Sequence, residues 1–124
     1  MNTRFTTAYF NEDPNFPSTF NASFNTSDSE GIINSVSNNE FWDFNGLQST
    51  QVILTWDTDS RIDEFVDNLE NLRVVGWDIT KNLWVDLGNT NFTGNINSGT
   101  ITSDEFIPNN YEIITFGALV ESDD

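Results

Sequence analysis

Apolar and polar residues alternate along several short stretches of this chain. Across residues 51–57, apolar side chains such as Leu54 and Trp56 fall on every second position, which places them on one face of a strand. Residues 72–78 and 83–87 show a similar β-prone pattern, and the connection between them has hairpin length. We therefore expect one strand with a strongly buried face, followed along the chain by two strands that pair antiparallel.

Five further stretches have the composition of strands, because aromatic and β-branched residues are concentrated in them. They are residues 4–10, 32–36, 40–44, 99–103 and 111–116. Gly and Asn residues that favour turns separate many of these stretches. Short strands at this spacing predict an all-β fold, a two-sheet antiparallel β-sandwich of immunoglobulin-like type with about seven to eight strands.

One segment departs from the two-residue period. Its apolar residues recur at intervals of three and four, at Ile62, Phe65, Val66 and Leu69. This spacing forms the apolar stripe of an amphipathic helix. Ser60 stands just ahead of the stripe, at capping-box distance from Asp63. We therefore predict one short helix near residues 60–70.

Length and composition limit the domain organisation. The chain has 124 residues, enough for one domain with a core of its own. We assign residues 1–120 to a single β-sandwich module and the acidic residues 121–124 to a linker stub. The sequence begins without the basic start and apolar run of a signal peptide, and it has no apolar run long enough for a membrane-spanning helix.

The charge and the missing residue types exclude several functions. The formal net charge is −16, from 20 acidic and four basic residues. Such a charge repels nucleic-acid phosphates and anionic lipid headgroups, so we expect neither nucleic acid nor membrane insertion. The chain has no His and no Cys, and it therefore lacks the imidazole bases and thiolates on which many enzymes and zinc sites depend. Carboxylate pairs arise by chance among so many acids, and we do not expect an enzyme.

Two blocks of sequence carry a resemblance to a known family. The blocks contain Leu72, Val74, Trp77, Trp84, Val85, Gly88, Asn89 and Thr90, and then Thr93, Gly94, Gly99, Thr100, Ile101, Thr102 and Ser103. Together they resemble a β-sandwich module of large secreted surface proteins of Bacteroidota, which the type IX system exports and which occurs in adhesins and gliding-associated proteins. The segment 57–70 departs from the family, because it is acidic and partly helical where the family is shorter and polar.

The resemblance implies a function outside the cell. It implies a structural or adhesive repeat or spacer module at the bacterial cell surface, without enzymatic activity, and it transfers no catalytic residue. The implied partners are neighbouring domains of the same chain, with an extracellular polysaccharide or a host or surface ligand in addition. The alternative function is a carbohydrate-binding module that tethers a secreted protein to polysaccharide.

The densest group of acids is a candidate calcium site. It consists of Asp57, Asp59, Asp63, Glu64 and Asp67. Ca²⁺ takes about six to eight oxygen ligands, and loops of this kind supply them. The segment fails the EF-hand template, which needs Gly and Glu where this chain has Ile62 and Asn68. The competing interpretation, which is favoured over calcium, is that Asp59 or Ser60 caps the helix while Asp63 and Glu64 lie in its first turn. The sequence therefore predicts either no cofactor or a structural Ca²⁺.

Four tryptophans allow two interpretations. Trp42, Trp56, Trp77 and Trp84 would form a sugar-stacking platform if their rings were exposed together. Trp56, however, shares the predicted buried face with Leu54, which favours a place in the core. The strand pattern leaves the exposure of Trp77 and Trp84 open. For the set as a whole, a role in the core or at a sheet edge is favoured over sugar binding.

Overall fold

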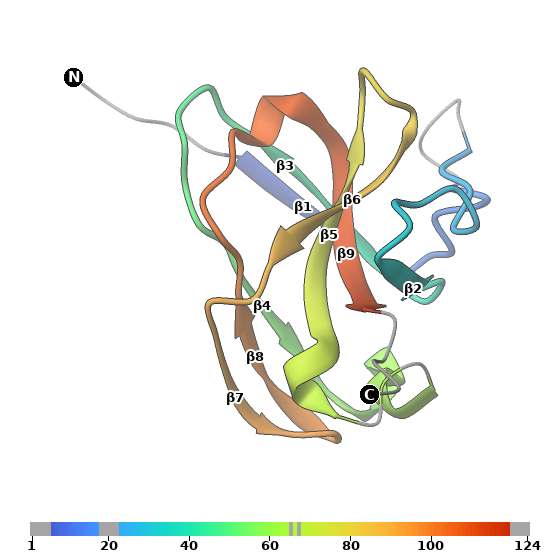
Figure 1. The fold of residues 1–124 in the computed structure, drawn as a ribbon, viewed down its shortest axis with the longest axis vertical. Coiled ribbons are helices and arrows are strands. Elements are labelled where there is room, and N and C mark those ends of the chain that lie inside the picture. The colour runs from blue at the N-terminus through green and yellow to red at the C-terminus, as the bar shows by residue number, and fades with distance from the viewer. Residues whose placement is uncertain (1–5, 18–22, 65, 67, 120–124) are drawn as a thin grey trace.

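Two antiparallel β-sheets stack face to face, which confirms the predicted β-sandwich (Figure 1). The computed structural model describes residues 6–17, 23–64, 66 and 68–119, so the predicted linker stub at 121–124 lies outside the described residues. The strands in this part of the chain are β1 (Thr6–Phe10), β2 (Ile33–Val36), β3 (Phe41–Asn45), β4 (Ile53–Trp56), β5 (Leu72–Asp78), β6 (Leu83–Gly88), β7 (Asn91–Asn95), β8 (Ser98–Thr102) and β9 (Tyr111–Leu119).

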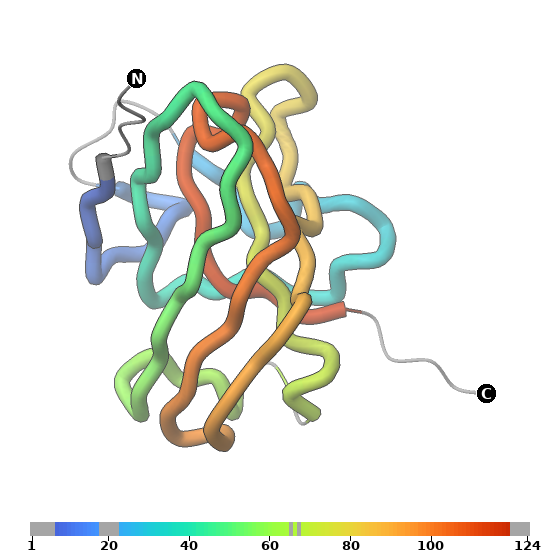
Figure 2. The backbone as a smooth tube through the Cα atoms, turned by 90° about the vertical axis from the view of Figure 1, so that its left-hand side faces the viewer, coloured from blue at the N-terminus to red at the C-terminus, as the bar shows by residue number. Residues whose placement is uncertain are grey.

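The larger sheet has six strands and the smaller sheet three. The larger sheet has the order β1-β3-β9-β5-β6, and β2 pairs with the C-terminal part of β9. The smaller sheet has the order β4-β8-β7, and Figure 2 shows it in front of the larger one. The predicted hairpin is confirmed as β5 and β6, which pair antiparallel with Trp77 opposite Trp84.

One core lies between the two sheets. Leu54 and Trp56 reach it from β4, Leu72 and Val74 from β5, and Phe116 from β9. All five side chains are buried, so the face predicted from the alternation of residues 51–57 is the buried face. The two-residue period therefore placed this core correctly.

A second core lies on the opposite face of the six-stranded sheet. Val75 and Trp77 of β5, Trp84 of β6 and Ile113 of β9 form it together with Phe24, which comes from the irregular segment ahead of β2. That segment is tied to β6, because the Trp84 amide donates to the carbonyl of Asp28. The six-stranded sheet is therefore covered on both faces, and the residues of β5 alternate between the two cores.

The predicted helical segment takes the form of separate 3-10 turns. They are η1 (Thr58–Ser60), η2 (Ile62–Glu64) and η3 (Leu69–Asn71), and a further turn, η4 (Pro108–Asn110), precedes β9. Arg61 ends η1 with a left-handed φ of 57°, which interrupts the helical path after one turn. Ile62 and Val66 are buried in the core between the sheets, as the apolar stripe predicts. Phe65 lies outside the described residues.

Candidate functional site

A polar cleft opens where the β1–β3 edge of the larger sheet meets the end of β4. Its volume is about 870 Å³. Residues of β1, the connection before β3, β3 itself, the end of β4 and the turns η1 and η2 line it. Segments far apart in the sequence therefore meet here, and the size is within the usual range of ligand pockets, about 300 to 1,000 Å³.

Glu40 is the buried charged residue of the cleft. Only 3% of its surface is exposed, and it stands directly ahead of β3, where its backbone carbonyl accepts a hydrogen bond from the buried Thr115 hydroxyl. Its Oε1 accepts a hydrogen bond of 2.8 Å from the hydroxyl of Tyr9. Its Oε2 is buried and has no hydrogen-bond donor in the described part of the chain. A buried carboxylate oxygen without a donor is unfavourable, so this atom is the unsatisfied group of the cleft.

Tyr9 and Trp42 form an aromatic corner beside Glu40. They stand opposite each other across β1 and β3, with ring centroids 5.2 Å apart and ring planes at 53°. Tyr9 is 52% exposed, whereas Trp42 is partly buried against the core between the sheets. The pKa of Tyr9 is raised to about 12, mainly by partial burial and then by the hydrogen bond to Glu40. Tyr9 is therefore a neutral hydrogen-bond donor at physiological pH.

The acids predicted as a calcium site form the rim of the cleft. Asp57, Asp59, Asp63 and Glu64 all line it and are all exposed, whereas Asp67 lies outside the described residues. Across the described ranges, no three acidic side chains gather closely enough to hold a metal ion. The structure thus brings four of the five predicted residues to one cleft without assembling them into a coordination sphere. The calcium site stays a prediction.

One rim residue, Asp57, caps the turn η1. The carboxylate of Asp57 accepts a hydrogen bond of 2.9 Å from the Asp59 amide, and the Ser60 hydroxyl lies 3.3 Å from the Asp57 amide to complete a capping box. The predicted capping is therefore present, but the N-cap residue is Asp57 in place of the predicted Asp59 or Ser60. Arg61 pairs with Glu64 at 3.1 Å, both side chains being more than half exposed. Exposed pairs of this kind contribute little to stability.

The tryptophans are mainly core residues. Trp56 is buried in the core between the sheets, while Trp77 and Trp84 are buried in the second core. The indole N–H of Trp56 donates to the carbonyl of Asn95 at 2.9 Å, which satisfies its polar group. A stacking platform made of all four rings is therefore excluded. Trp42 is the partly buried member of the set, and it lines the cleft.

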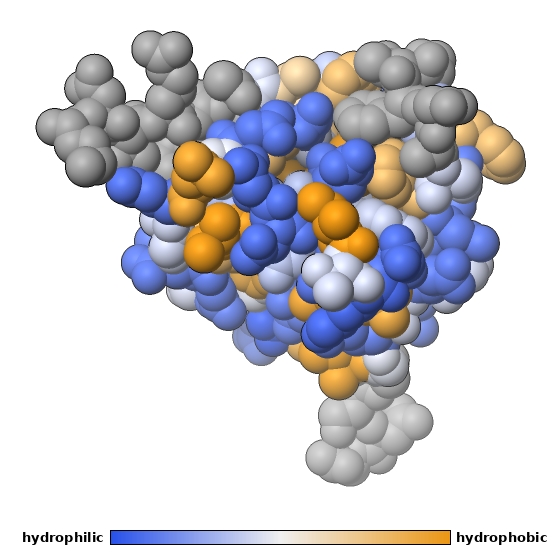
Figure 3. Space-filling model, turned by 90° about the horizontal axis from the view of Figure 1, so that it is seen from above, coloured by the Kyte–Doolittle hydropathy of each residue, from blue (hydrophilic) through white to orange (hydrophobic). Residues whose placement is uncertain are grey.

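Three exposed apolar side chains lie at one end of the sandwich. Leu47 follows β3, Ile79 follows β5 and Ile107 precedes η4, and each of the three is exposed. Figure 3 views this end and shows apolar side chains in separate areas among polar ones. Separate exposed apolar residues are ordinary on soluble domains, so this end is a weaker candidate for a site than the cleft.

Sequence reasoning missed both Glu40 and Tyr9. Glu40 shares strand parity with Trp42 and Phe44, which pack toward the core between the sheets. Glu40 directly precedes β3 on the side of the strand that carries these apolar residues, and this position in the sequence could have indicated a buried acid. The partnership with Tyr9 spans 31 residues and depends on the pairing of β1 with β3, which local patterns do not give.

No protein-family model, curated protein or solved structure matches this chain. No helix in the described ranges has the length and apolar character needed to cross a bilayer.

Proposed function

We propose that this chain is a non-enzymatic structural or adhesive module of a large extracellular bacterial surface protein. The observation that carries the proposal is the topology of the six-stranded sheet. β1 runs antiparallel to β3, and β3 runs antiparallel to β9. β1 and β9 are therefore parallel, so the chain enters this sheet at one end and leaves it at the other.

The distance between entry and exit suits a spacer. Thr6 lies at the level of Asn45 at one end of the sheet, and Leu119 ends β9 at the other. β9 has nine residues, which corresponds to roughly 25 to 30 Å at about 3.3 Å per residue. A polypeptide that passes through several such modules gains this length at each one. The partners in this role are the neighbouring domains of the same chain.

The charge supports the same role. A net charge of −16 makes copies of the module repel one another at low ionic strength, which favours an extended arrangement and opposes collapse. Salt screens this repulsion, so the extension of a tandem array is expected to decrease somewhat as ionic strength rises.

Small-angle X-ray scattering of two copies in tandem tests the spacer function. We expect the directly joined pair to have nearly twice the maximum dimension of the single copy. A pair joined by a long Gly/Ser linker is the control, because its copies are free to fold back. A directly joined pair that is hardly longer than one copy would contradict the spacer function.

Recognition of a neutral carbohydrate is the second candidate function, and one observation supports it. The half-exposed ring of Tyr9 stands over the cleft beside Trp42, and aromatic rings bind the apolar faces of sugars. A glycan array, followed by a tryptophan-fluorescence titration of any positive glycan, tests this function. Binding that saturates and is lost in Tyr9→Ala is expected if it holds, and an array without positive glycans would refute it.

A further inference from the structure

We propose that the acidic cleft binds the guanidinium or ammonium group of a basic side chain presented by a polypeptide partner. The inference rests on the adhesive part of the proposed function and names the chemistry of the partner. It begins from Glu40, whose Oε2 is buried, faces no donor in the described chain and belongs to a residue that lines the cleft. A ligand that carries hydrogen-bond donors into the cleft and reaches this atom would satisfy it.

The charge of the cleft selects a cation. Four rim acids and the carboxylate of Glu40 line it, and Arg61 is the cationic side chain among the lining residues. Arg61 is already paired with Glu64, which leaves the rim strongly negative. Phosphate, sulfate and carboxylate ligands would meet repulsion here, while a positive ligand is attracted and guided inward.

The shape of the cleft favours an organic cation over a metal ion. Its volume of about 870 Å³ admits a whole side chain with part of its backbone. The rim acids of the described residues are too dispersed for three of them to share one metal ion. Dispersed acceptors suit a guanidinium, which spreads five N–H donors over a flat group and carries no acceptor.

The aromatic corner supplies the second contact that such a cation uses. The Tyr9 hydroxyl donates to the Glu40 carboxylate, and the Trp42 ring packs against the Tyr9 ring at 53°, so a group bound at the carboxylate lies near these two rings. Cations are attracted to the faces of Tyr and Trp rings within about 6 Å, and more strongly where water is excluded. A carboxylate next to aromatic rings therefore distinguishes a cation from a neutral donor.

A titration with matched probes tests the proposal. The first probe is N-acetyl-arginine amide, and the second is N-acetyl-citrulline amide, which has nearly the same shape and no charge. The shifts of the indole N–H signal of Trp42 in nuclear magnetic resonance spectra report binding in the cleft, since Trp42 lines it. We expect the arginine probe to saturate these shifts and the citrulline probe to leave them nearly unchanged. Equal responses to the two probes would overturn the proposal.

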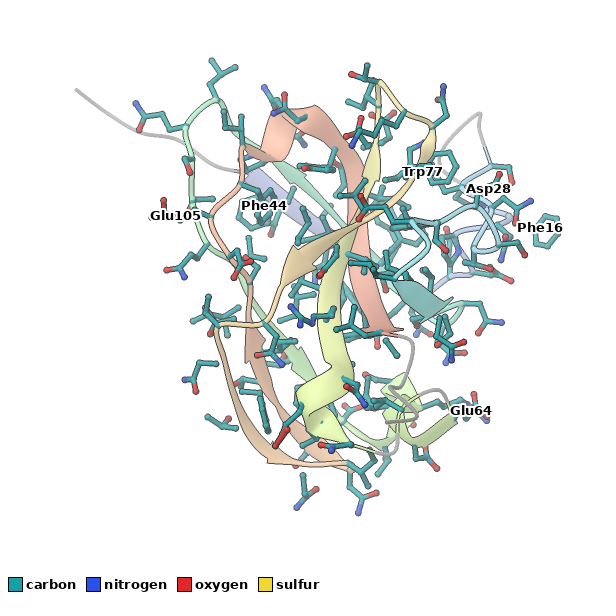
Figure 4. All side chains as sticks on the ribbon, viewed as in Figure 1. Phe16, Asp28, Phe44, Glu64, Trp77 and Glu105 are labelled. Atoms are coloured by element: carbon teal, nitrogen blue, oxygen red, sulfur yellow. The ribbon has the colours of Figure 1, made fainter. Side chains whose placement is uncertain are left out.

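Two isosteric variants locate the effect. Glu40→Gln should weaken binding of the arginine probe by about tenfold or more, because it removes the charge from the hydrogen bond. Glu105→Gln is the matched control, with the same change of net charge at an exposed residue that does not line the cleft and that Figure 4 shows far from Glu64. Binding within about twofold of the unchanged protein is expected for the control. Equal weakening in both variants would show a general charge effect and refute the site.

Titrations with other ligands and a replacement variant complete the test. Saturation by CaCl₂ or by a neutral sugar, without a response to the arginine probe, would overturn the proposal in favour of those ligands. If circular dichroism shows that Glu40→Gln is unfolded, Tyr9→Ala takes its place, and undiminished binding in that variant refutes the aromatic contact on which the proposal depends. Failure of these titrations leaves the spacer function untouched, because its scattering test does not involve the cleft.

Discussion

Phe116 connects the aromatic side chains of the core between the sheets, and its replacement by alanine tests how the sandwich is held together. The residue is completely buried in β9. Its ring meets Trp42 edge-on at 5.4 Å and Trp56 edge-on at 6.1 Å, with interplanar angles of 88° and 89°. Phe116→Ala removes both aromatic contacts and leaves a cavity beneath the cleft wall.

The expected loss of stability is large. Replacing a buried Phe by Ala destabilises a protein by about 3 to 5 kcal/mol. We expect the upper half of that range, because edge-to-face pairs contribute beyond the area that they bury. A domain has about 5 to 15 kcal/mol of total stability, so the variant loses about a quarter or more of it. With a urea m-value of about 2 kcal/mol/M, the unfolding midpoint should fall by about 2 M.

Urea unfolding followed by tryptophan fluorescence and by far-ultraviolet circular dichroism measures this loss. Phe16→Ala is the matched control, since Phe16 is 82% exposed and its removal should change the free energy of unfolding by less than about 0.5 kcal/mol. A loss below about 1.5 kcal/mol for Phe116→Ala, or equal losses in the two variants, would refute the packing argument.

Three further predictions concern pH, backbone geometry and calcium. The pKa of Tyr9 is higher in the folded protein than in the unfolded chain, so the free energy of unfolding should fall as pH rises from about 10 to about 12. Tyr9→Phe should remove this part of the fall, which denaturant unfolding of both proteins across that pH range measures. Gly94 has a φ of +91° near the end of β7, where a Cβ would collide with the Ser98 carbonyl. Gly94→Ala should therefore lower stability by roughly 1 to 2 kcal/mol in urea unfolding, whereas Gly31→Ala, with open space around it, should be nearly neutral. If the acids of residues 57–67 bind calcium, the melting temperature should rise with millimolar Ca²⁺ and return with chelator, and an unchanged melting temperature would remove the calcium prediction.

The strands that the sequence predicted well are those with a clear two-residue period or a strong apolar content. β4 shows this best, because Leu54 and Trp56 are buried while the residue ahead of each, Ile53 and Thr55, is exposed. β7 was missed entirely. Its sequence, NFTGN, lies at the edge of the smaller sheet with every residue exposed except the partly buried Phe92. A strand that buries so little leaves no period in the sequence, and only its pairing with β8 defines it.

Burial on both faces of the larger sheet was also beyond local patterns. Trp77 and Val74 occupy opposite faces of β5, and both are buried because a core covers each face. The second core depends on Phe24, which reaches Trp77 edge-on at 5.7 Å from an irregular segment far away in the sequence. Periodicity identifies which residues share a face, but it does not say what covers that face.

The candidate site was predictable in part. The acids of residues 57–64 were recognised as one group, and they do share a cleft. Glu40 and Tyr9 were not recognised, since their contact requires the register that sets Tyr9 opposite Trp42. The sequence therefore indicated the acidic rim of the cleft, while the pairing of β1 with β3 brings Tyr9 to Glu40.

The position of β9 has a consequence for the way the protein is made. β9 pairs with β2, β3 and β5, so the middle of the larger sheet is formed by the last of the nine described strands to leave the ribosome. Until it emerges, β1 and β3 have no neighbour that links them to β5 and β6, and both cores lack the residues that β9 contributes. The strands synthesised before β9 must therefore remain unassembled until β9 emerges, in a state that exposes apolar surface and invites chaperones. Folding is then expected to be a single late event, and truncation within β9 should abolish the whole fold instead of trimming one edge.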